Sequence, residues 1–301
     1  MTLAYMMLSR ETSDAAAFRQ SQKTYEIAKL SGGVTAYRDL GKKSARTVVF
    51  IHGATLGSLA YAPIVDGFVA RGYRVLTYDG YGRGFSDRAD PAPLSMALLC
   101  QQLLELMDHC DIPVAALYGT SLGAAIAARF AVVHPQRVAA VAFEAPLIKA
   151  PRNPKLALLR LPLLRLWLAR IVMIPTILAR GESIDEEGGE QAHRVLAHFR
   201  EQFNVRGTER DLLSLLTGCA VSDRVEDHAA IAATSLPVYF VYALDDPEMP
   251  RALVEATIAM HPEKARGAKA FPEGGHFFSK GRHAELAEGF HGFLRKHGLA
   301  A

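Results

Sequence analysis

A serine between glycines stands near the middle of the chain, in Gly119-Thr120-Ser121-Leu122-Gly123. A serine hydroxyl is a poor nucleophile until a neighbouring base takes its proton, and that base needs an acid to orient it. The pattern suits this chemistry when a strand precedes it and a helix follows, because the tight turn exposes the serine at the head of the helix. We therefore interpret Ser121 as a nucleophile. In the alternative interpretation, Ser121 only caps the helix of an ordinary strand-to-helix turn.

Candidates for the acid and the base lie downstream, in the chain order nucleophile, acid, histidine that this arrangement uses. The acid is expected after an apolar strand at 237–242, where Asp245-Asp246-Pro247 follows. The base is expected after the last strand, where two glycines precede His276. Because loops beyond the carboxyl ends of parallel strands meet at one edge of a sheet, the three segments can converge.

The elements that must position these groups alternate between strands and helices. Apolar runs predict strands at 25–30, 34–39, 47–51, 74–78, 114–118, 138–143, 237–242 and 268–271. Helical periodicity or composition predicts helices at 61–71, 94–109, 122–130 and 283–297. We therefore expect an α/β fold, a three-layer sandwich around a mainly parallel sheet that opens with a β-hairpin.

The alternation stops at residue 146 and resumes near residue 235. Residues 147–234 show helical stretches and loops without a convincing strand, which predicts a helical cap (lid) insertion over one end of the sheet. The core domain then comprises residues 24–146 and 235–301, and residues 1–23 form an N-terminal extension outside the core.

The insertion contains a leucine-rich stretch at 155–180, which raises the question of a membrane. Arg160, Arg165 and Arg170 interrupt this stretch, and Pro162 and Pro175 break its helix. A bilayer span needs about 20 apolar residues in a row, so we favour a cap helix that lines an apolar pocket. A membrane-surface helix stays open as the alternative, because arginines beside leucines also suit that role.

Composition excludes several classes of protein. Half of the 301 residues are hydrophobic and 22% are charged, which leaves ample material for a core. The formal net charge of +3 gives no electrostatic reason to expect nucleic acid as a partner. Three cysteines are too few and too widely spaced for a disulfide framework or a zinc site, and they suit a reducing compartment. Since the first residues lack a secretory signal pattern, we expect a cytoplasmic protein.

Five stretches together resemble the α/β-hydrolase fold family, in its serine-nucleophile, capped esterase/lipase-like branch. They fall in the family's order and extend the resemblance from about residue 25 to residue 299: His52-Gly53-Ala54, the loop DGYGRGFSD at 79–87, the segment 119–123, Asp245-Asp246-Pro247, and Gly275-His276. The resemblance implies the α/β-hydrolase fold, with an eight-stranded sheet and a cap.

The resemblance also implies a role for each matching position. Ser121 would be the nucleophile and His276 the general base. The family's acid follows a strand-end glycine by three residues; Ala243 replaces that glycine here, and the spacing indicates Asp246. Asp245 is its neighbour and less favoured. Glu144 is an alternative, because some relatives place the acid after the strand that follows the turn with the nucleophile.

Acyl transfer places negative charge on the former carbonyl oxygen, and fixed backbone amides stabilise that charge. By resemblance, the oxyanion hole consists of the N–H groups of Ala54 and Leu122. His52 would hold the loop without taking part in catalysis, and the loop 80–84 would be a structural turn near the rim of the site.

The expected activity is hydrolysis of a small-molecule carboxylic ester through an acyl-enzyme intermediate, without cofactor or metal. The leucine-rich insertion suggests that the substrate carries an apolar group. Hydrolysis of carbon–carbon bonds, lactones or amides and perhydrolysis stay open, as does a non-catalytic homologue that binds a ligand. Haloalkane dehalogenase and epoxide hydrolase are disfavoured, because those relatives carry Asp at the position of Ser121.

Overall fold

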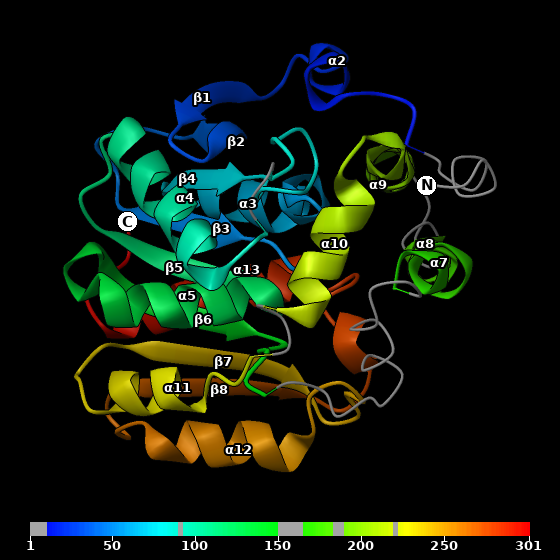
Figure 1. Ribbon diagram of the computed structural model, residues 1–301. Coiled ribbons are helices and arrows are strands. Elements are labelled where there is room, and N and C mark those ends of the chain that lie inside the picture. Colours follow the sequence, from blue (N-terminus) through cyan, green and yellow to red (C-terminus); the bar gives the residue numbers. More distant parts are fainter. Residues whose placement is uncertain (1–10, 90–92, 150–164, 183–189, 219–221) are drawn as a thin grey trace.

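The structure is a computed structural model that describes residues 11–89, 93–149, 165–182, 190–218 and 222–301. An eight-stranded sheet runs through its centre in the order β1-β2-β4-β3-β5-β6-β7-β8 (Figure 1). The pairs β1–β2 and β2–β4 are antiparallel, and all other neighbours are parallel. The prediction of an α/β fold with a mainly parallel sheet is confirmed.

The central strands consist almost entirely of buried residues, because layers of helices cover both faces of the sheet. Every residue of β4, β5 and β7 is buried, whereas the edge strand β1 buries only its middle residue, Ala28. The strands are β1 (Glu26–Leu30), β2 (Gly33–Leu40), β3 (Thr47–Ile51), β4 (Arg74–Tyr78), β5 (Ala115–Thr120), β6 (Val138–Glu144), β7 (Val238–Ala243) and β8 (Arg266–Phe271).

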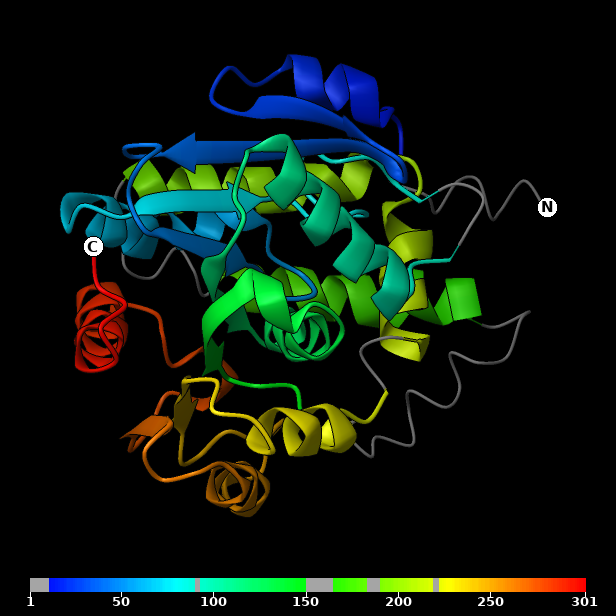
Figure 2. The same cartoon turned by 90° about the vertical axis from the view of Figure 1, so that its left-hand side faces the viewer.

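Two hydrophobic clusters fill the space between the sheet and its helices. The first contains Leu103 and Phe130 and lies under α4 (Met96–His109), α5 (Leu122–Val133), α11 (Val225–Ala232) and α12 (Arg251–Met260). The second contains Phe68 and Phe290 and lies under α3 (Ala62–Ala70) and α13 (His283–Lys296). Figures 1 and 2 show α5 and α13 on opposite faces of the sheet.

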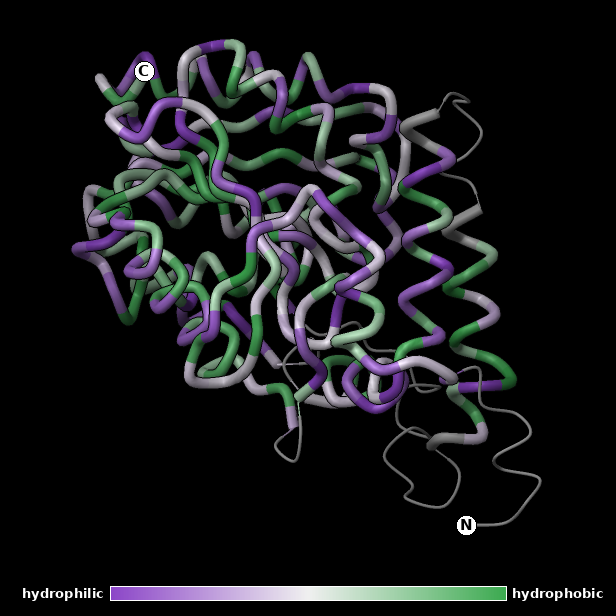
Figure 3. Tube along the Cα trace, turned by 90° about the horizontal axis from the view of Figure 1, so that it is seen from above, coloured by the Kyte–Doolittle hydropathy of each residue, from purple (hydrophilic) through white to green (hydrophobic). Residues whose placement is uncertain are grey.

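Helices join β6 to β7 in the described part of residues 145–237, which we call the intervening segment. They are α7 (Arg165–Leu168), a π-helical turn (Ala169–Met173), α8 (Ile174–Glu182), α9 (Glu190–Glu201), α10 (Thr208–Thr217) and α11. Figure 3 shows α7–α8 and α9 side by side, with hydrophobic and hydrophilic residues alternating along each turn. This pattern is typical of helices that bury one face.

The buried faces of these helices form a cluster of their own. Ile174 of α8, Phe199 of α9 and Leu212 of α10 belong to it, and Leu56 from the loop after β3 packs against it. Figure 1 places α8, α9 and α10 beyond the edge at which the parallel strands end. The intervening segment therefore contacts the loop that carries Ala54.

The described part of the leucine-rich stretch has one of its arginines turned inward. Arg170 Nε lies 2.6 Å from Glu209 Oε2, and the two side chains are 7% and 4% exposed. Arg160 and Pro162 lie outside the described residues. Among the helices in the described ranges, none has the length and hydropathy to cross a bilayer.

A short helix, α2 (Ala15–Gln20), lies within the segment expected to be an extension. Phe18 is buried, with its ring centroid 4.8 Å from that of Phe85 and 5.6 Å from that of His198 on α9. Arg19 forms an ion pair of 2.8 Å with Asp87. The described residues before β1 thus contact both the loop after β4 and the intervening segment.

Candidate active site

The turn between β5 and α5 holds Ser121 in an unusual conformation, with φ +53° and ψ −111°. The glycines at 119 and 123 leave no room for a side chain, because a Cβ at either position would collide with backbone atoms. A Cβ on Gly119 would lie 2.3 Å from the carbonyl oxygen of Gly123, and a Cβ on Gly123 would lie 2.0 Å from that of Ile51. A non-glycine residue in this region of backbone space is strained, and such strain concentrates at functional sites.

The structure brings together the three side chains that the sequence singles out. His276 Nε2 lies 3.0 Å from Ser121 Oγ, and His276 Nδ1 lies 2.9 Å from Asp246 Oδ2. With its proton on Nδ1, the imidazole donates to the carboxylate and accepts the serine proton at Nε2. The three residues come from the ends of β5 and β7 and from the loop after β8, at one edge of the sheet.

Asp246 is buried, and its two carboxylate oxygens accept hydrogen bonds from different partners. Oδ1 accepts hydrogen bonds from the amides of Glu248 at 2.8 Å and Met249 at 3.1 Å, which leaves Oδ2 for His276. Burial alone would raise the pKa of Asp246, but these hydrogen bonds and the charge of His276 hold it below its ordinary value. The carboxylate is therefore ionised at neutral pH.

The two alternative acids make no hydrogen bond to the imidazole in the described structure. Asp245 is exposed and accepts from the amides of Gly275 at 2.9 Å and Gly274 at 3.1 Å, so it anchors the loop that carries His276. Glu144 is buried below the turn and accepts a hydrogen bond of 2.6 Å from Tyr118. Burial raises the pKa of Glu144, against the opposing effect of the Tyr118 hydrogen bond.

The predicted oxyanion donors lie on both sides of Ser121. Leu122 begins α5, so its N–H is one of the first four that lack an acceptor within the helix. A Cβ on Gly53 would lie 3.6 Å from Ser121 Cβ, which places the loop with Ala54 directly beside the serine. The amide of Ala54 has no backbone acceptor in the described residues. These two amides are therefore the candidate donors to an oxyanion at Ser121.

His276 lies among carboxylates that favour its protonated form. Burial lowers the pKa of His276, but the hydrogen bond to Asp246 and the charges of Glu248, Asp246 and Glu144 together raise it above its ordinary value. Sequence reasoning missed Glu248, whose Oε2 lies 3.8 Å from His276 Nε2. Its only signal was a third acidic residue shortly after the strand.

This environment predicts the acid limb of the pH profile. Protonated His276 has no lone pair for the serine proton, so kcat/KM falls as the pH drops through the raised pKa. We expect the midpoint of this limb above about 6.5, the ordinary value for histidine. The measurement is kcat/KM of an ester substrate between about pH 4.5 and 9. A midpoint below that of a free histidine would contradict the prediction.

The order of the strands and the helices on both faces define an α/β hydrolase. The model of the family described as serine aminopeptidase, S33, matches residues 42–279, so the chain belongs to this family. Family membership identifies the chain as a hydrolase.

Curated relatives match a part of the chain that includes about a third of its residues. A 2-hydroxy-6-oxononadienedioate/2-hydroxy-6-oxononatrienedioate hydrolase of Cupriavidus pinatubonensis is 38% identical over 97 residues, 31% of this chain and 34% of the relative. A protein of the same name from Paraburkholderia xenovorans is 36% identical over 105 residues, 34% of this chain and 36% of the relative. The chain thus spans about a third of the length of these relatives.

Solved structures resemble the chain over most of its length. A hydrolase from Pseudomonas aeruginosa has a TM-score of 0.74 at 18% identity, with 90% of this chain and 98% of that one covered. An enol-lactonase from Burkholderia xenovorans has a TM-score of 0.73 at 20% identity, with 90% and 100% covered. At these identities the likeness shows the fold.

Proposed function

We propose that this chain is a serine hydrolase that cleaves carboxylic esters, including cyclic ones, through an acyl-enzyme intermediate. The observation that carries the proposal is the pair of hydrogen bonds at His276, one to Ser121 and one to Asp246. The strained turn at Ser121 and the two amides beside it support the same chemistry.

In the proposed mechanism, His276 takes the proton of Ser121 as its Oγ attacks the carbonyl carbon. The amides of Ala54 and Leu122 bind the oxyanion, and each such donor typically lowers the barrier by about 3 kcal/mol. The tetrahedral intermediate collapses, and His276 passes the proton to the leaving alcohol. His276 then activates a water that hydrolyses the acyl-Ser121 ester, and the serine is regenerated.

Apolar side chains beside the candidate triad support an apolar group on the substrate. Phe277 is 44% exposed, with its ring centroid 5.7 Å from that of His276, and Leu244 is 36% exposed next to Asp245. Exposed large apolar residues at a site rim favour binding of apolar ligands. The apolar cluster of the intervening segment, which reaches Leu56, extends the same character above the site.

A second candidate is hydrolysis of a carbon–carbon bond in a dienone acid. The curated relatives that match this chain are named for the hydrolysis of 2-hydroxy-6-oxononadienedioate. A serine, histidine and acid can serve this chemistry as well as ester cleavage, so the substrate decides between the two.

The test is a panel of purified-protein assays with three classes of substrate. It comprises p-nitrophenyl esters with acyl chains from acetate to laurate, a γ- and a δ-lactone, and 2-hydroxy-6-oxohexa-2,4-dienoates. We expect kcat/KM to be highest for esters and to rise with chain length before it levels off. A dienoate hydrolysed faster than every ester and lactone would assign the second candidate function, and hydrolysis of none would refute the proposal.

A further inference from the structure

Three successive carbonyl groups of the loop after β3 are held by buried side chains. His52 Nδ1 donates to the oxygen of Gly53 at 2.7 Å, Arg83 Nε donates to that of Ala54, and Gln202 Nε2 donates to that of Thr55 at 2.9 Å. All three side chains are less than a tenth exposed. The carbonyl of Gly53 shares its peptide plane with the N–H of Ala54, so the hydrogen bond from His52 holds that plane directly. The bonds from Arg83 and Gln202 hold the next two peptide planes, which limits the rotation of the backbone on the other side of Ala54.

The loop after β4 supplies most of this support. The amide of Gly80 donates to His52 Nε2 at 2.7 Å, so the proton of this imidazole sits on Nδ1 and points at Gly53. Burial lowers the pKa of His52, which keeps the ring neutral. Arg83 belongs to the same loop, and its Nη1 donates to the oxygen of Gly82 at 2.5 Å.

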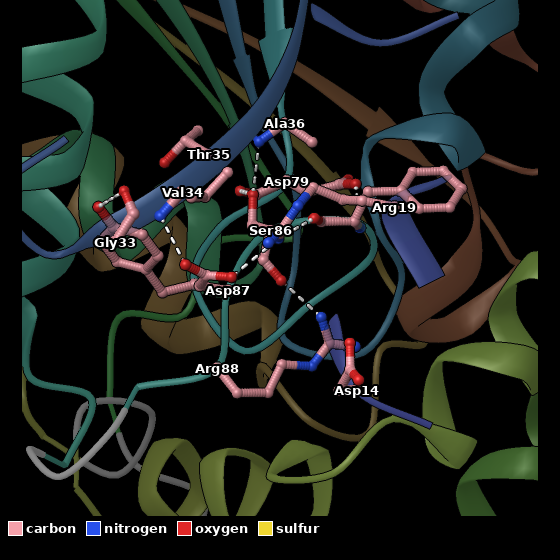
Figure 4. Close-up of polar contacts among 12 residues, drawn as sticks. Asp14, Arg19, Gly33, Val34, Thr35, Ala36, Asp79, Ser86, Asp87 and Arg88 are labelled. Atoms are coloured by element: carbon pink, nitrogen blue, oxygen red, sulfur yellow. Dashed lines mark hydrogen bonds and ion pairs between the residues drawn. The ribbon is translucent and has the colours of Figure 1, made fainter. Parts of the chain in front are cut away.

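The loop that carries Arg83 is itself fixed to the sheet (Figure 4). Ser86 Oγ accepts from the amide of Ala36 at 2.9 Å, and Asp87 Oδ2 accepts from the amide of Val34 at 2.8 Å. Asp79 accepts from the amide of Phe85 at 2.9 Å and closes the loop on itself. The backbone that carries Arg83 is therefore fixed by hydrogen bonds, and its side chain extends from there to Ala54.

The guanidinium of Arg83 is buried although its hydrogen bonds do not satisfy all of its donors. Its side chain is 2% exposed, and in the described residues its Nη2 has no hydrogen-bond partner. Burial lowers the pKa of Arg83 to about 9, with the charge of Asp211 opposing that effect, so the guanidinium is still charged at neutral pH. A cavity of about 20 Å³, enough for one water molecule, is lined by Arg83, Gly53 and Leu122. A buried charge that lacks full pairing costs free energy, which makes Arg83 a candidate for a functional role.

We propose that Arg83 is a positioning residue: by holding the carbonyl of Ala54 it restrains the backbone that presents the amide of Ala54 to the oxyanion, and it places a positive charge behind that amide. The inference rests on the proposed acyl-transfer function. Its signature is a lower kcat with little change in KM, because the oxyanion exists only in the transition state and the intermediate.

The test compares Arg83→Met with a matched control, Arg88→Met. Arg88 is a second buried arginine of the same region, but it donates to the oxygens of Gly84 and Ser86 and does not reach Ala54. Loss of one oxyanion donor lowers kcat by about 10²- to 10³-fold, and a misoriented donor should lose part of that. We expect kcat of Arg83→Met to fall about 10- to 100-fold with KM within threefold, and Arg88→Met to keep kcat.

Two further measurements separate positioning from stability. Arg83→Lys retains the charge and a donor without the planar fork, so it should recover part of the activity and of the affinity for a trifluoromethyl ketone that forms a tetrahedral adduct. The rate at which a fluorophosphonate labels Ser121 should fall in parallel with kcat, since labelling also places negative charge on an oxygen in the hole.

Equal kcat in the two methionine variants, or equal labelling rates when Arg83→Met or Arg83→Lys is compared with wild type, would overturn the inference. If wild type hydrolyses no ester but is labelled at Ser121, the proposed ester activity fails while the labelling rates still decide the role of Arg83. If Arg83→Met does not fold, Arg83→Lys and its ketone affinity decide.

Discussion

Replacement of Ser121 by alanine is expected to lower kcat for the best ester substrate by about 10⁴- to 10⁶-fold, with the protein still folded. In serine hydrolases the nucleophile, base and acid act as a unit, so loss of the serine removes nearly the whole contribution of the three. Residual catalysis comes from the oxyanion amides and from substrate binding. Unchanged hydrolysis in Ser121→Ala would refute the nucleophile assignment.

The same variant has a structural control built in. Ser121 makes its backbone hydrogen bond to the oxygen of Glu144 at 2.9 Å through the main chain, and alanine keeps that bond. The thermal unfolding midpoint should therefore stay within a few degrees of wild type. A fluorophosphonate should add its mass to one serine in wild type and to none in Ser121→Ala, as intact mass spectrometry would measure.

The second large effect is expected at Asp246. In Asp246→Asn the amide presents no anion to His276, so the imidazole loses both its preferred tautomer and the charge that stabilises its protonated form. We expect kcat to fall about 10³- to 10⁴-fold. The acid limb of kcat/KM should also move to lower pH, because the hydrogen bond and charge of Asp246 raise the pKa of His276.

Two neighbouring carboxyl groups provide the controls. Asp245→Asn can still accept one of the hydrogen bonds from Gly274 and Gly275, and Glu144→Gln can still accept from Tyr118. Each is expected to retain activity within about tenfold of wild type. If Glu144→Gln is crippled and Asp246→Asn is not, the acid is Glu144, and the hydrogen bond between His276 and Asp246 only positions the loop.

Local patterns in the sequence predict most of the strands and helices of the fold. The strands predicted at 47–51 and 74–78 have the same limits in the structure, because buried apolar runs between loops are short and sharply bounded. The helix α12 was not predicted: it follows Pro250 without a side-chain hydrogen bond at its N-cap, so the usual signal for a helix start is missing. The helix α2 lies in a segment without apolar periodicity, where the side chain of Asp14 caps its first turn and Phe18 is its one buried residue.

Some residues of the candidate site are likewise predicted by local patterns in the sequence, and others are not. Ser121 and His276 stand out because glycines and strand ends mark their loops, and these signals are local. The choice between Asp245 and Asp246 depends on which carboxylate turns toward the imidazole, and adjacent residues give no local signal for that. Arg83 and Gln202 could not be predicted as supports of the oxyanion loop, since their partners lie 29 and 147 residues away in the chain.

Gln202 joins the intervening segment to two loops of the core at once. Its Nε2 donates to the oxygen of Thr55, and its Oε1 accepts from the amide of Gly84 at 3.2 Å. Segments inserted between two strands are attractive units for chimeras, in which one segment is exchanged for another to alter substrate range. In this protein a graft that omits the side-chain amide of Gln202 would leave the carbonyl of Thr55 and the N–H of Gly84 without that partner. A segment grafted onto this core should therefore keep a glutamine at the position of Gln202, so that both hydrogen bonds to the core are retained.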